Sequence, residues 1–588
     1  MAFDPKTDLV GLLREALNVV APEAALPEIH LERPRDPSHG DFASNVAMQL
    51  ARSLKKNPRE IAQQIVAALP GAPWLVGAEI AGAGFINFRL AAGSKLEVVR
   101  SVLSSGEDFG RSQQGQGRKV QVEFVSANPT GPLHVGHGRG AAYGASLSSL
   151  LMFAGWDVTR EYYVNDAGRQ MDILAVSTWL RYLQSHGVDV PFPPNAYQGA
   201  YVKSMAAQLT AAHGLKYVKP AIAVLAGTPG QPAPDLDEKL AAQQKEVHLD
   251  KLIENAKDLL GEDWFYVHQH ALSEQLGDCR SDLEAFGVHF EVWFSEKSLF
   301  DTGLVARCVD LLAQQGHIYV EKGAKWFRST AFGDEKDRVV QRENGLYTYF
   351  ASDIAYHLNK FERGFERIIN IWGADHHGYI PRVKGAVQAL QLPVEQLEVA
   401  LVQFAVLYRD GQKASMSTRS GEFVTLRDLR QEVGNDACRF FYILRKADQH
   451  LDFDLDLAKS QSNENPVYYI QYAHARVCSV LAQWGGDETQ LLATANLNRL
   501  ESAREIDLAT RLAAFPEVIT SAANDLAPHQ VAFYLKDLAS DFHTWYNAER
   551  MLVDDQELRD ARVALALAVR QVIRNGMALL GVICPASM

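Results

Sequence analysis

The first part of the chain alternates hydrophobic and polar positions in the way that a small α+β module requires. Hydrophobic residues recur with the period of an amphipathic helix in three segments, residues 8–20, 41–53 and 58–68. Residues 84–89 alternate with the period that is typical of a strand. A stretch rich in Ser, Gly and Gln then predicts a loop or linker over residues 104–117.

After this linker the pattern changes to strand, glycine-rich turn, helix and strand. Residues 119–125 and 158–164 are the predicted strands, and residues 141–154 form a helix of small residues between them. Two strands joined by a helix imply a parallel sheet, which binds ligands in a crevice at the carboxyl ends of its strands. The turn over residues 129–139 is therefore predicted to open onto a crevice of the size of a phosphate.

The sheet is expected to be interrupted by a polar insertion and then to resume. The insertion covers about residues 184–290, and an apolar strand follows over residues 367–372. From Thr425 to the end the pattern is helical, and no strand is predicted there. We therefore predict a multidomain α/β protein with an N-terminal α+β module (residues 1–110), a Rossmann-like parallel-sheet domain (residues 111–424, with the insertion at about 185–290) and an all-α bundle (residues 425–588).

Composition excludes several classes of protein. With 588 residues, 47% of them hydrophobic, and a net charge of -13, the chain can bury several cores and is not expected to be disordered. No run of about 18 apolar residues is present, so no membrane span is expected. The five cysteines are far apart and form no CxxC pair, which favours a reducing, cytoplasmic location. The acidic balance argues against non-specific nucleic-acid binding, but not against a local basic surface.

The strongest chemical signal is the turn over residues 128–140, N-P-T-G-P-L-H-V-G-H-G-R-G. His134 and His137 lie where a helix follows a parallel strand, and helix N-termini attract phosphate through unpaired N–H groups and the helix dipole. Their imidazoles can donate hydrogen bonds to phosphate oxygens, while Gly136 and Gly138 leave room for a nucleotide. A zinc site is a weaker interpretation because no third ligand has a recognised spacing, and a pair of structural histidines is weaker because the surrounding turn suits a phosphate.

These residues resemble the signatures of the class I aminoacyl-tRNA synthetases. His134-Val-Gly-His137 is similar to the H-I-G-H signature, with Val in place of Ile. Ser415-Met-Ser-Thr-Arg419 is similar to the second signature, K-M-S-K-S, and the order and separation of the two fit the family. Residues 122–134, 161–168 and 435–440 resemble the arginyl-tRNA synthetases in particular. The resemblance spans nearly the whole chain.

The resemblance implies an ATP-dependent ligase that activates L-arginine to arginyl-adenylate and transfers it to the terminal ribose of tRNA(Arg). It implies Mg2+ with ATP and no structural metal, an N-terminal module that grips the outer corner of the tRNA, and a helical bundle that binds the anticodon. A pocket that hydrogen-bonds a charged guanidinium rejects amino acids without that group by about 10⁴-fold or more, so no proofreading site is needed. We expect a monomer.

The second signature departs from the family pattern. Ser415 and Thr418 stand where the family has lysines. A mobile cationic loop must nevertheless close over the β- and γ-phosphates, and Lys413 and Arg419 are the nearby cations. The catalytic candidates here are Lys413, Ser417 and Arg419, and the candidates for ATP contact are Ser415 and Met416. A solvated basic loop is the alternative.

An arginine substrate needs carboxylates in a desolvated pocket, because its guanidinium is planar, always charged and carries five donors. Glu123 lies on the strand before the turn, where an unpaired buried carboxylate would cost several kcal/mol. Tyr349 and Asp353 are four residues apart and share one face of a predicted helix. By resemblance the arginine-binding set is Glu123, Asn128, Tyr349 and Asp353. The alternatives are a rim position or internal salt bridge for Glu123 and an ordinary amphipathic helix for the other pair.

The strand over residues 367–372 ends in Gly373-Ala-Asp375-His376-His377, on the side where such folds bind ligands. We assign Gly373, Asp375 and His376 to the adenosine end of ATP or to the pocket wall. A metal site and a structural turn are the alternatives.

The helix that opens with Asn465 and Pro466 carries the candidate RNA contacts. Tyr469, Tyr472 and Arg476 share one face, and unstacked RNA bases stack on aromatic rings and guanidinium planes. A core stripe of the bundle is the alternative for some of these tyrosines. By resemblance, Met588 should lie close to the anticodon. Candidates for phosphate contact in the N-terminal module, with a solvated face as the alternative, are Arg33, Arg35, Lys55 and Lys56.

Three rival functions remain to be weighed. The first is another class I synthetase, for an amino acid such as cysteine or lysine. The second is a catalytically dead tRNA-binding paralogue, which the presence of both histidines and both carboxylates disfavours. The third is a small-molecule nucleotidylyltransferase with the same turn, which the long helical C-terminus argues against.

Overall fold

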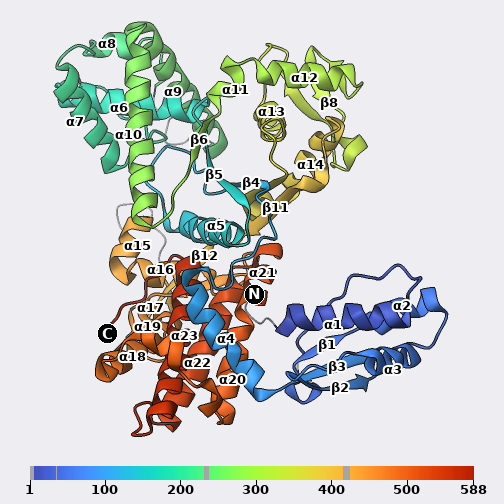
Figure 1. The fold of residues 1–588 in the computed structure, drawn as a ribbon. Coiled ribbons are helices and arrows are strands. Elements are labelled where there is room, and N and C mark those ends of the chain that lie inside the picture. Colours follow the sequence, from blue (N-terminus) through green and yellow to red (C-terminus); the bar gives the residue numbers. More distant parts are fainter. Residues whose placement is uncertain (1–4, 35, 231–236, 415–423) are drawn as a thin grey trace.

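A five-stranded parallel sheet forms the centre of the computed structural model, which describes residues 5–34, 36–230, 237–414 and 424–588 (Figure 1). The strands lie in the order β11-β10-β4-β5-β6, and each neighbouring pair is parallel. Their bounds are β4 Lys119–Glu123, β5 Asp157–Val164, β6 Val292–Ser295, β10 Arg367–Gly373 and β11 Leu397–Val402. The parallel sheet confirms the predicted α/β fold class.

Helix α5 (Val135–Phe153) lies between the sheet and the helical bundle (Figure 1). Its small residues allow close packing on the sheet: a Cβ at Gly144 would lie 2.3 Å from the ring of Phe124. Both faces of the helix are consequently buried, as expected of a helix that is apolar all round.

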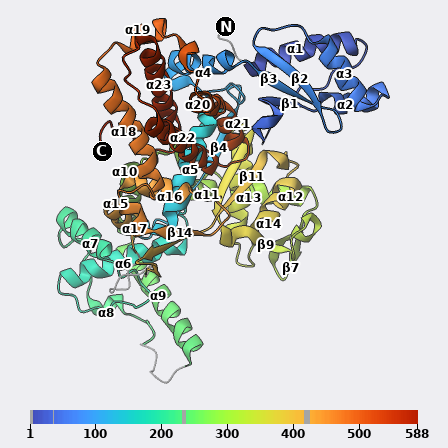
Figure 2. The same cartoon turned by 90° about the horizontal axis from the view of Figure 1, so that it is seen from below.

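The insertion after β5 is built of helices and loops and contains no strand among its described residues. It has its own hydrophobic core, centred on Trp179 and Leu252, and it projects to one side of the molecule (Figure 2). Its helices are α6 Arg169–Ser185, α7 Ala200–His213, α8 Ala221–Val224, α9 Glu238–Leu260 and α10 Asp263–Ala285.

A second lobe covers the side of the sheet away from the bundle. It combines helices with a three-stranded antiparallel sheet of order β7-β8-β9. Its elements are α11 Lys297–Asp301, α12 Leu304–Gln314, β7 Ile318–Glu321, β8 Ala324–Phe327, β9 Arg338–Gln341, α13 Tyr349–Glu362 and α14 Ile380–Ala389. Helix α13 leads directly into β10, so this lobe delivers side chains to the carboxyl edge of the central sheet.

The C-terminal bundle begins after the second signature. Its helices are α15 Leu426–Val433, α16 Asn435–Ile443, α17 Leu455–Lys459, α18 Pro466–Trp484, α19 Glu488–Thr494, α20 Ala503–Ala513, α21 Phe515–Asn524, α22 His529–Ala548 and α23 Gln556–Leu579. The prediction that this part contains no strand is wrong. Strand β14 (Leu451–Asp454) pairs with β12 (Ala405–Arg409), which also pairs with β13 (Gln412–Lys413). Four alternating residues between helices are too short a pattern to stand out.

The N-terminal module is a three-stranded antiparallel sheet covered by helices. Its elements are α1 Pro5–Val20, β1 Phe42–Ser44, α2 Val46–Leu54, α3 Pro58–Ala68, β2 Leu75–Ala81 and β3 Phe85–Leu90. The helix predicted from residue 41 is wrong at its start, because Phe42 pairs with Phe88 in the sheet. Strand β2 and the connecting helix α4 (Ala92–Ser105) were not predicted.

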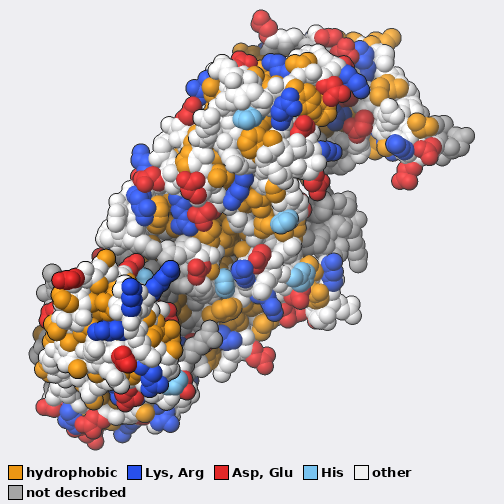
Figure 3. Space-filling view, turned by 90° about the vertical axis from the view of Figure 1, so that its right-hand side faces the viewer, with side chains coloured by type: hydrophobic (Ala, Val, Ile, Leu, Met, Phe, Trp, Pro, Cys, Tyr) orange, Lys and Arg blue, Asp and Glu red, His pale blue; other side chains and the backbone are white. Residues whose placement is uncertain are grey.

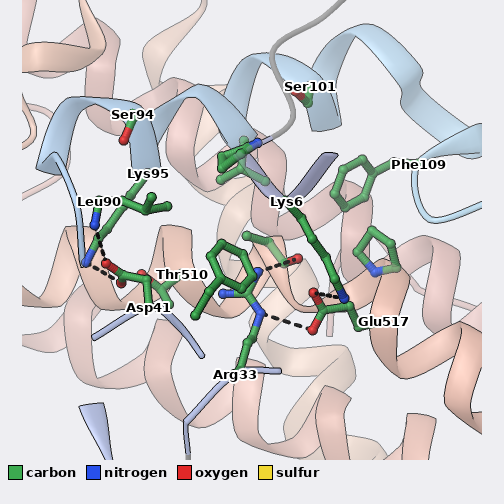
Figure 4. Close-up of a pocket in the computed structure, with 15 residues that line it drawn as sticks. Lys6, Arg33, Asp41, Leu90, Ser94, Lys95, Ser101, Phe109, Thr510 and Glu517 are labelled. Carbon is green, nitrogen blue, oxygen red and sulfur yellow. Dashed lines mark hydrogen bonds and ion pairs between the residues drawn. The ribbon is translucent and has the colours of Figure 1, made fainter. Parts of the chain in front are cut away.

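The module docks on the bundle through two ion pairs beside a cavity of about 250 Å³ (Figure 4). Lys6 Nζ and Arg33 Nε each lie 3.1 Å from a carboxylate oxygen of Glu517 in α21, and Arg33 stacks on the ring of Phe42. Arg33, a candidate for phosphate contact, is thus turned to a carboxylate inside the molecule. Arg35 lies outside the described residues.

Lys55 and Lys56 are exposed. In Figure 3 the N-terminal module forms the lower lobe, where basic side chains lie among hydrophobic and acidic ones. Along the described residues, none of the helices combines the length and apolar character that a membrane crossing would need.

Candidate functional site

The first turn of α5 is shaped by the two histidines. His134 is the N-cap: its Nδ1 accepts a hydrogen bond from the backbone N–H of Gly136 (3.1 Å), and Nδ1 of His137 accepts one from the N–H of His134 (3.3 Å). These are the reciprocal bonds of a capping box. The helix therefore begins at Val135. The predicted start at residue 141 was six residues too late, because the glycines were interpreted as part of a turn.

The histidine rings stack with centroids 3.7 Å apart and are neutral. Burial lowers the pKa of His137 to about 3, with the neighbouring His134 as a smaller cause, and burial also lowers the pKa of His134. Because each Nδ1 accepts a backbone hydrogen bond, each ring carries its proton on Nε2. The pair can donate hydrogen bonds to an anion without carrying charge itself.

The glycines of the turn meet different neighbours. A Cβ at Gly136 would lie 2.8 Å from the His134 ring and 3.3 Å from Phe404, so a side chain there would displace the cap. A Cβ at Gly138 would lie 2.6 Å from the hydroxyl of Tyr442 in α16, so this glycine serves the packing of α5 on the bundle. Phe404 also approaches Gly373, at 3.7 Å from its Cβ position.

The described chain that resumes after the second signature, at Val424, lies beside the first signature. Val135 N–H donates to Val424 O (3.1 Å), and Leu426 N–H donates to Leu133 O (2.8 Å). Lys413 is exposed on β13. The remaining candidates of this signature lie outside the described residues: Ser415, Met416, Ser417 and Arg419. Their roles stay predictions.

A cavity of about 360 Å³ opens where β4, α13 and β10 meet. Glu123 and Asp353, predicted from distant parts of the sequence, both line it, as do Gly373 and His376. The other lining residues are Val125, Ser126, Tyr163, Tyr356, His357, Ile371, Trp372 and Tyr379. The two predicted carboxylates thus meet in one pocket at the carboxyl edge of the sheet.

Glu123 is already paired inside the protein. Lys360 Nζ donates to Glu123 Oε2 (2.6 Å) and to Asn370 Oδ1 (2.7 Å), and Ser126 Oγ donates to Glu123 Oε1 (3.1 Å). The Lys360 side chain is fully buried. The internal salt bridge that the sequence left open is therefore present, although Glu123 still borders the cavity.

Asp353 has no cationic partner among the described residues. The hydroxyl of Tyr379 donates a hydrogen bond to its Oδ2. The pKa of Asp353 is raised to about 7: burial is the largest cause and the carboxylates of Glu296 and Glu123 add to it, while Tyr379 and Lys360 act in the opposite direction. A cation entering the cavity would meet a carboxylate that gains from being paired.

Glu296 is a buried carboxylate that the sequence analysis missed; it does not line the cavity, but its charge acts on Asp353. It follows β6, is 3% exposed and accepts a hydrogen bond from Ser352 Oγ (2.8 Å), while its Oε2 finds no partner among the described residues. Burial raises its pKa. The available signal was a carboxylate just after a sheet strand, on the edge where such sheets bind ligands.

A buried ion pair fixes the wall of the pocket. Two nitrogens of Arg363 donate to the carboxylate of Glu161 (2.6 and 2.9 Å), and the hydroxyl of Tyr356 donates to the same carboxylate (2.6 Å). This contact ties the C-terminal end of α13 to β5. It therefore sets where Asp353, on the same helix, projects.

Asn128, Tyr349 and Asp375 lie apart from this cavity. Asn128 is exposed, and the Tyr349 side chain is 58% exposed near Gly168. Asp375 lies in the 3-10 turn after β10, 3.7 Å from His376, and both side chains are mostly exposed. Within the described ranges, no group of three His, Cys, Asp or Glu side chains is placed to hold a metal ion.

The candidate RNA contacts gather on α18. Arg476 lies over the ring of Tyr472 (4.5 Å), and Tyr469 and Tyr472 both pack against His543 of α22. All three side chains are half-buried, so this face is part bundle packing and part surface. Met588 is half-exposed and borders a separate cavity of about 490 Å³.

Comparison with known proteins identifies the family. The profile of the arginyl tRNA synthetase N terminal domain matches residues 8–90, and that of the DALR anticodon binding domain matches residues 470–588. The profile of the class I (R) tRNA synthetase catalytic domain matches residues 98–208 and 235–450. An arginine–tRNA ligase of Dechloromonas aromatica (strain RCB) is 74% identical over 588 residues, covering 100% of both chains. The chain belongs to the arginyl-tRNA synthetase family.

Two further matches are also similar to this chain over most of its length. An arginine–tRNA ligase of Azoarcus sp. (strain BH72) is 71% identical over 100% of both chains. The crystal structure of a putative arginyl-tRNA synthetase from Campylobacter jejuni has a TM-score of 0.73 and 31% identity, covering 85% of this chain and 100% of that one.

As a member of this family the protein is an arginine–tRNA ligase, a class I enzyme that uses ATP, arginine and tRNA. The rival assignments, including another class I synthetase and a catalytically dead paralogue, receive no support from these matches.

Proposed function

We propose that the cavity between β4, α13 and β10 binds the side chain of arginine, and that the N-terminal end of α5 binds the phosphates of ATP. One observation carries the proposal. Two carboxylates, Glu123 and Asp353, line one cavity, and its lining residue Gly373 shares the neighbour Phe404 with Gly136 in the first turn of α5.

The charge balance of the cavity supports a guanidinium as ligand. Lys360 neutralises Glu123, which leaves Asp353 as the lining carboxylate without a cation among the described residues. Burying such a group unpaired is unfavourable, and the planar guanidinium fork can pair with it through two parallel hydrogen bonds. Tyr356 and Trp372 add aromatic surface, on which a guanidinium stacks well.

The end of α5 supports a site for ATP. The helix dipole and the Nε2–H groups of His134 and His137 favour the charge that develops on the α-phosphate when the arginine carboxylate attacks. No general base is needed, because that carboxylate is already a nucleophile. Lys413 and, by resemblance, the residues of the second signature meet the departing pyrophosphate, with Mg2+ held on the phosphates of ATP. Gly136 and Gly373 border the path along which ATP lies.

We assign tRNA contacts to two surfaces. Tyr472 and Arg476, stacked on each other on α18, offer planes to unpaired bases, with Tyr469 beside them and Met588 at the chain's end. Lys55 and Lys56 offer charge to the phosphates of the tRNA corner. Asn128 and Tyr349 stay predicted arginine contacts.

We further propose the division into residues 1–110, 111–424 and 425–588, a monomeric enzyme, and a cytoplasmic location. The described cysteines are free rather than bridged, which agrees with a reducing compartment.

The proposed arginine site is tested with L-citrulline, which has the shape of arginine without its charge. In pyrophosphate exchange with tRNA present, we expect kcat/KM for citrulline to be lower than for arginine by about 10⁴-fold, because the carboxylates would lose their partner. An Asp353→Asn enzyme should narrow that gap, since its pocket no longer requires a cation. Equal ratios in the two enzymes would contradict the assignment.

A further inference from the structure

A single buried guanidinium joins the histidine turn to the sheet that carries Lys413. Arg139 lies on α5 two residues after His137 and is 1% exposed. Its Nη1 donates to Gln403 O (2.9 Å) and Gln449 O (2.7 Å), its Nη2 donates to Lys446 O (2.9 Å), and its Nε donates to Tyr442 O (3.3 Å). Among the described residues it makes no ion pair, so backbone carbonyls alone satisfy this charge.

The acceptors are not scattered. Gln403 lies two residues before β12, and Gln449 lies two residues before β14. These strands are parallel neighbours, with Ala405 opposite Leu451. Nη1 of Arg139 is therefore hydrogen-bonded to the backbone just before the first residue of both strands. Because β12 also pairs with β13, the position of Lys413 relative to α5 depends on this contact.

The same contact sets the position of Phe404. This residue follows Gln403, and its ring approaches both Gly136 and Gly373, the two glycines on the proposed path of ATP. Tyr442 adds a second link, because its hydroxyl donates to Val135 O (2.9 Å) in the first turn of α5. A shift of the strands would change both the wall beside the histidines and the reach of Lys413.

We propose that Arg139 is a positioning residue for adenylate formation: it holds the β12–β13 hairpin and Phe404 in register with His134 and His137. This inference rests on the proposed ATP site at the end of α5. Arg139 touches no substrate; it acts by fixing the groups that do. The planar fork is essential, because a lysine offers one compact ammonium that cannot reach carbonyls from three segments.

The structure supplies a matched control in Arg439 of α16. This guanidinium is also buried, at 2% exposed, and also serves carbonyls: Nε donates to Leu580 O (2.9 Å), and Nη1 donates to Phe286 O and Gly287 O (3.2 Å each). It anchors the end of α23 and the end of the insertion. Its Nη2 also donates to Ser146 Oγ (3.4 Å) in the middle of α5, but among the described residues no hydrogen bond joins it to β12, β14 or the histidine turn.

The experiment compares Arg139→Lys with Arg439→Lys in pyrophosphate exchange, with tRNA present and rates expressed per titrated active site. Both should lower the melting temperature. Only Arg139→Lys should lower kcat, by about 30-fold, since misplacement near 1 Å costs up to about 10²-fold. It should raise KM for ATP while KM for arginine stays within about twofold. An unchanged kcat, or equal losses in the two variants, would overturn the proposal.

Two further variants keep the test decisive. If Arg139→Lys does not fold, Tyr442→Phe probes the second link of the same contact and should lower kcat about threefold with KM for arginine unchanged; no change would overturn the proposal. His137→Ala separates the inference from its premise. A normal kcat in that enzyme would remove the ATP site itself, whereas a slow His137→Ala beside a normal Arg139→Lys would remove only the positioning role.

Discussion

The proposed arginine cavity and the end of α5 lie along one edge of the sheet, yet their electrostatics are opposite. The cavity is lined by two carboxylates, one of them paired with the buried Lys360, and the pKa of the other, Asp353, is raised to about 7. The end of α5 has two histidines whose pKa values are lowered by burial, so they stay neutral. Burial disfavours the charged form of the side chains in both places. Only in the cavity can an incoming cation pair with the buried group and stabilise its charged form.

With the proposed sites, this electrostatic difference lets one edge of the sheet bind two reactants of opposite charge, the guanidinium of arginine and the triphosphate of ATP. A guanidinium is attracted by ionisable groups that are poised to become charged. A triphosphate is met by neutral donors and a helix dipole, which need no counter-charge when ATP is absent. Most of the variants below change one of the two proposed sites, and the kinetic constants show whether the other site is affected.

The largest effect is expected from Asp353→Asn. Removing this carboxylate should lower kcat/KM for arginine by about 10³-fold, since losing one partner of a buried charge pair costs about 3–5 kcal/mol. KM for ATP should stay within about twofold. Glu362→Gln, an exposed change on the same helix, is the control and should change neither constant. A comparable rise in both Michaelis constants would contradict the separation of the two sites.

His137→Ala should lower kcat by about 10²-fold, the usual effect of removing one donor to developing charge. Steady-state exchange gives kcat, and filter binding gives the tRNA dissociation constant, which should not change. The loss of the reciprocal capping-box bond from the N–H of His134 should cost only about 1 kcal/mol of stability, since the His134 cap itself remains. A normal kcat with weakened tRNA binding would contradict the assigned role.

The pH dependence of arginine use should report Asp353. Arginine binds its carboxylate form, so kcat/KM for arginine should fall by about tenfold between pH 8 and pH 6, as the group takes up a proton below its pKa of about 7. His137 does not contribute there, because burial lowers its pKa to about 3. In Asp353→Asn this fall should be absent. Its persistence would assign the titration to another group.

The smallest effect is expected from Glu296→Gln. This change removes one of the charges that raise the pKa of Asp353, so the midpoint of the pH profile should move down by about 0.5 unit. The amide can still accept the hydrogen bond of Ser352. A midpoint that stays in place would mean that Glu296 and Asp353 are not electrostatically coupled.

Part of the proposed site could be predicted from local sequence, and the rest could not for a physical reason. His134 and His137 stand in a short pattern at a predicted helix start, whereas Asp353 is predicted by resemblance, because its spacing from Tyr349 fits an ordinary amphipathic helix equally well. Lys360 and Glu296 stand in no such pattern: Lys360 lies 237 residues from its partner Glu123, and only the sheet brings them together. No local pattern encodes such a contact, because it depends on strand order.

The errors in secondary structure have a similar cause. The glycines at 136, 138 and 140 lower helix propensity, yet α5 begins at Val135 because the histidine cap and close packing on Tyr442 outweigh it. Phe42 joins a strand because it pairs with Phe88. That partner lies far along the chain, so the local pattern around Phe42 did not indicate it. Tertiary contacts, rather than the segments themselves, decided both outcomes.

The pairing of β14 with β12 has a practical consequence for anyone dividing this enzyme. A fragment that stops at the end of α16 would leave the edge of β12 with unpaired backbone groups, and Arg139 would lose two of its acceptors. The catalytic half is therefore unsuited to expression by itself. Two separately produced halves would have to recombine by inserting a strand, which makes this junction a place to build a version of the enzyme that works only after reassembly.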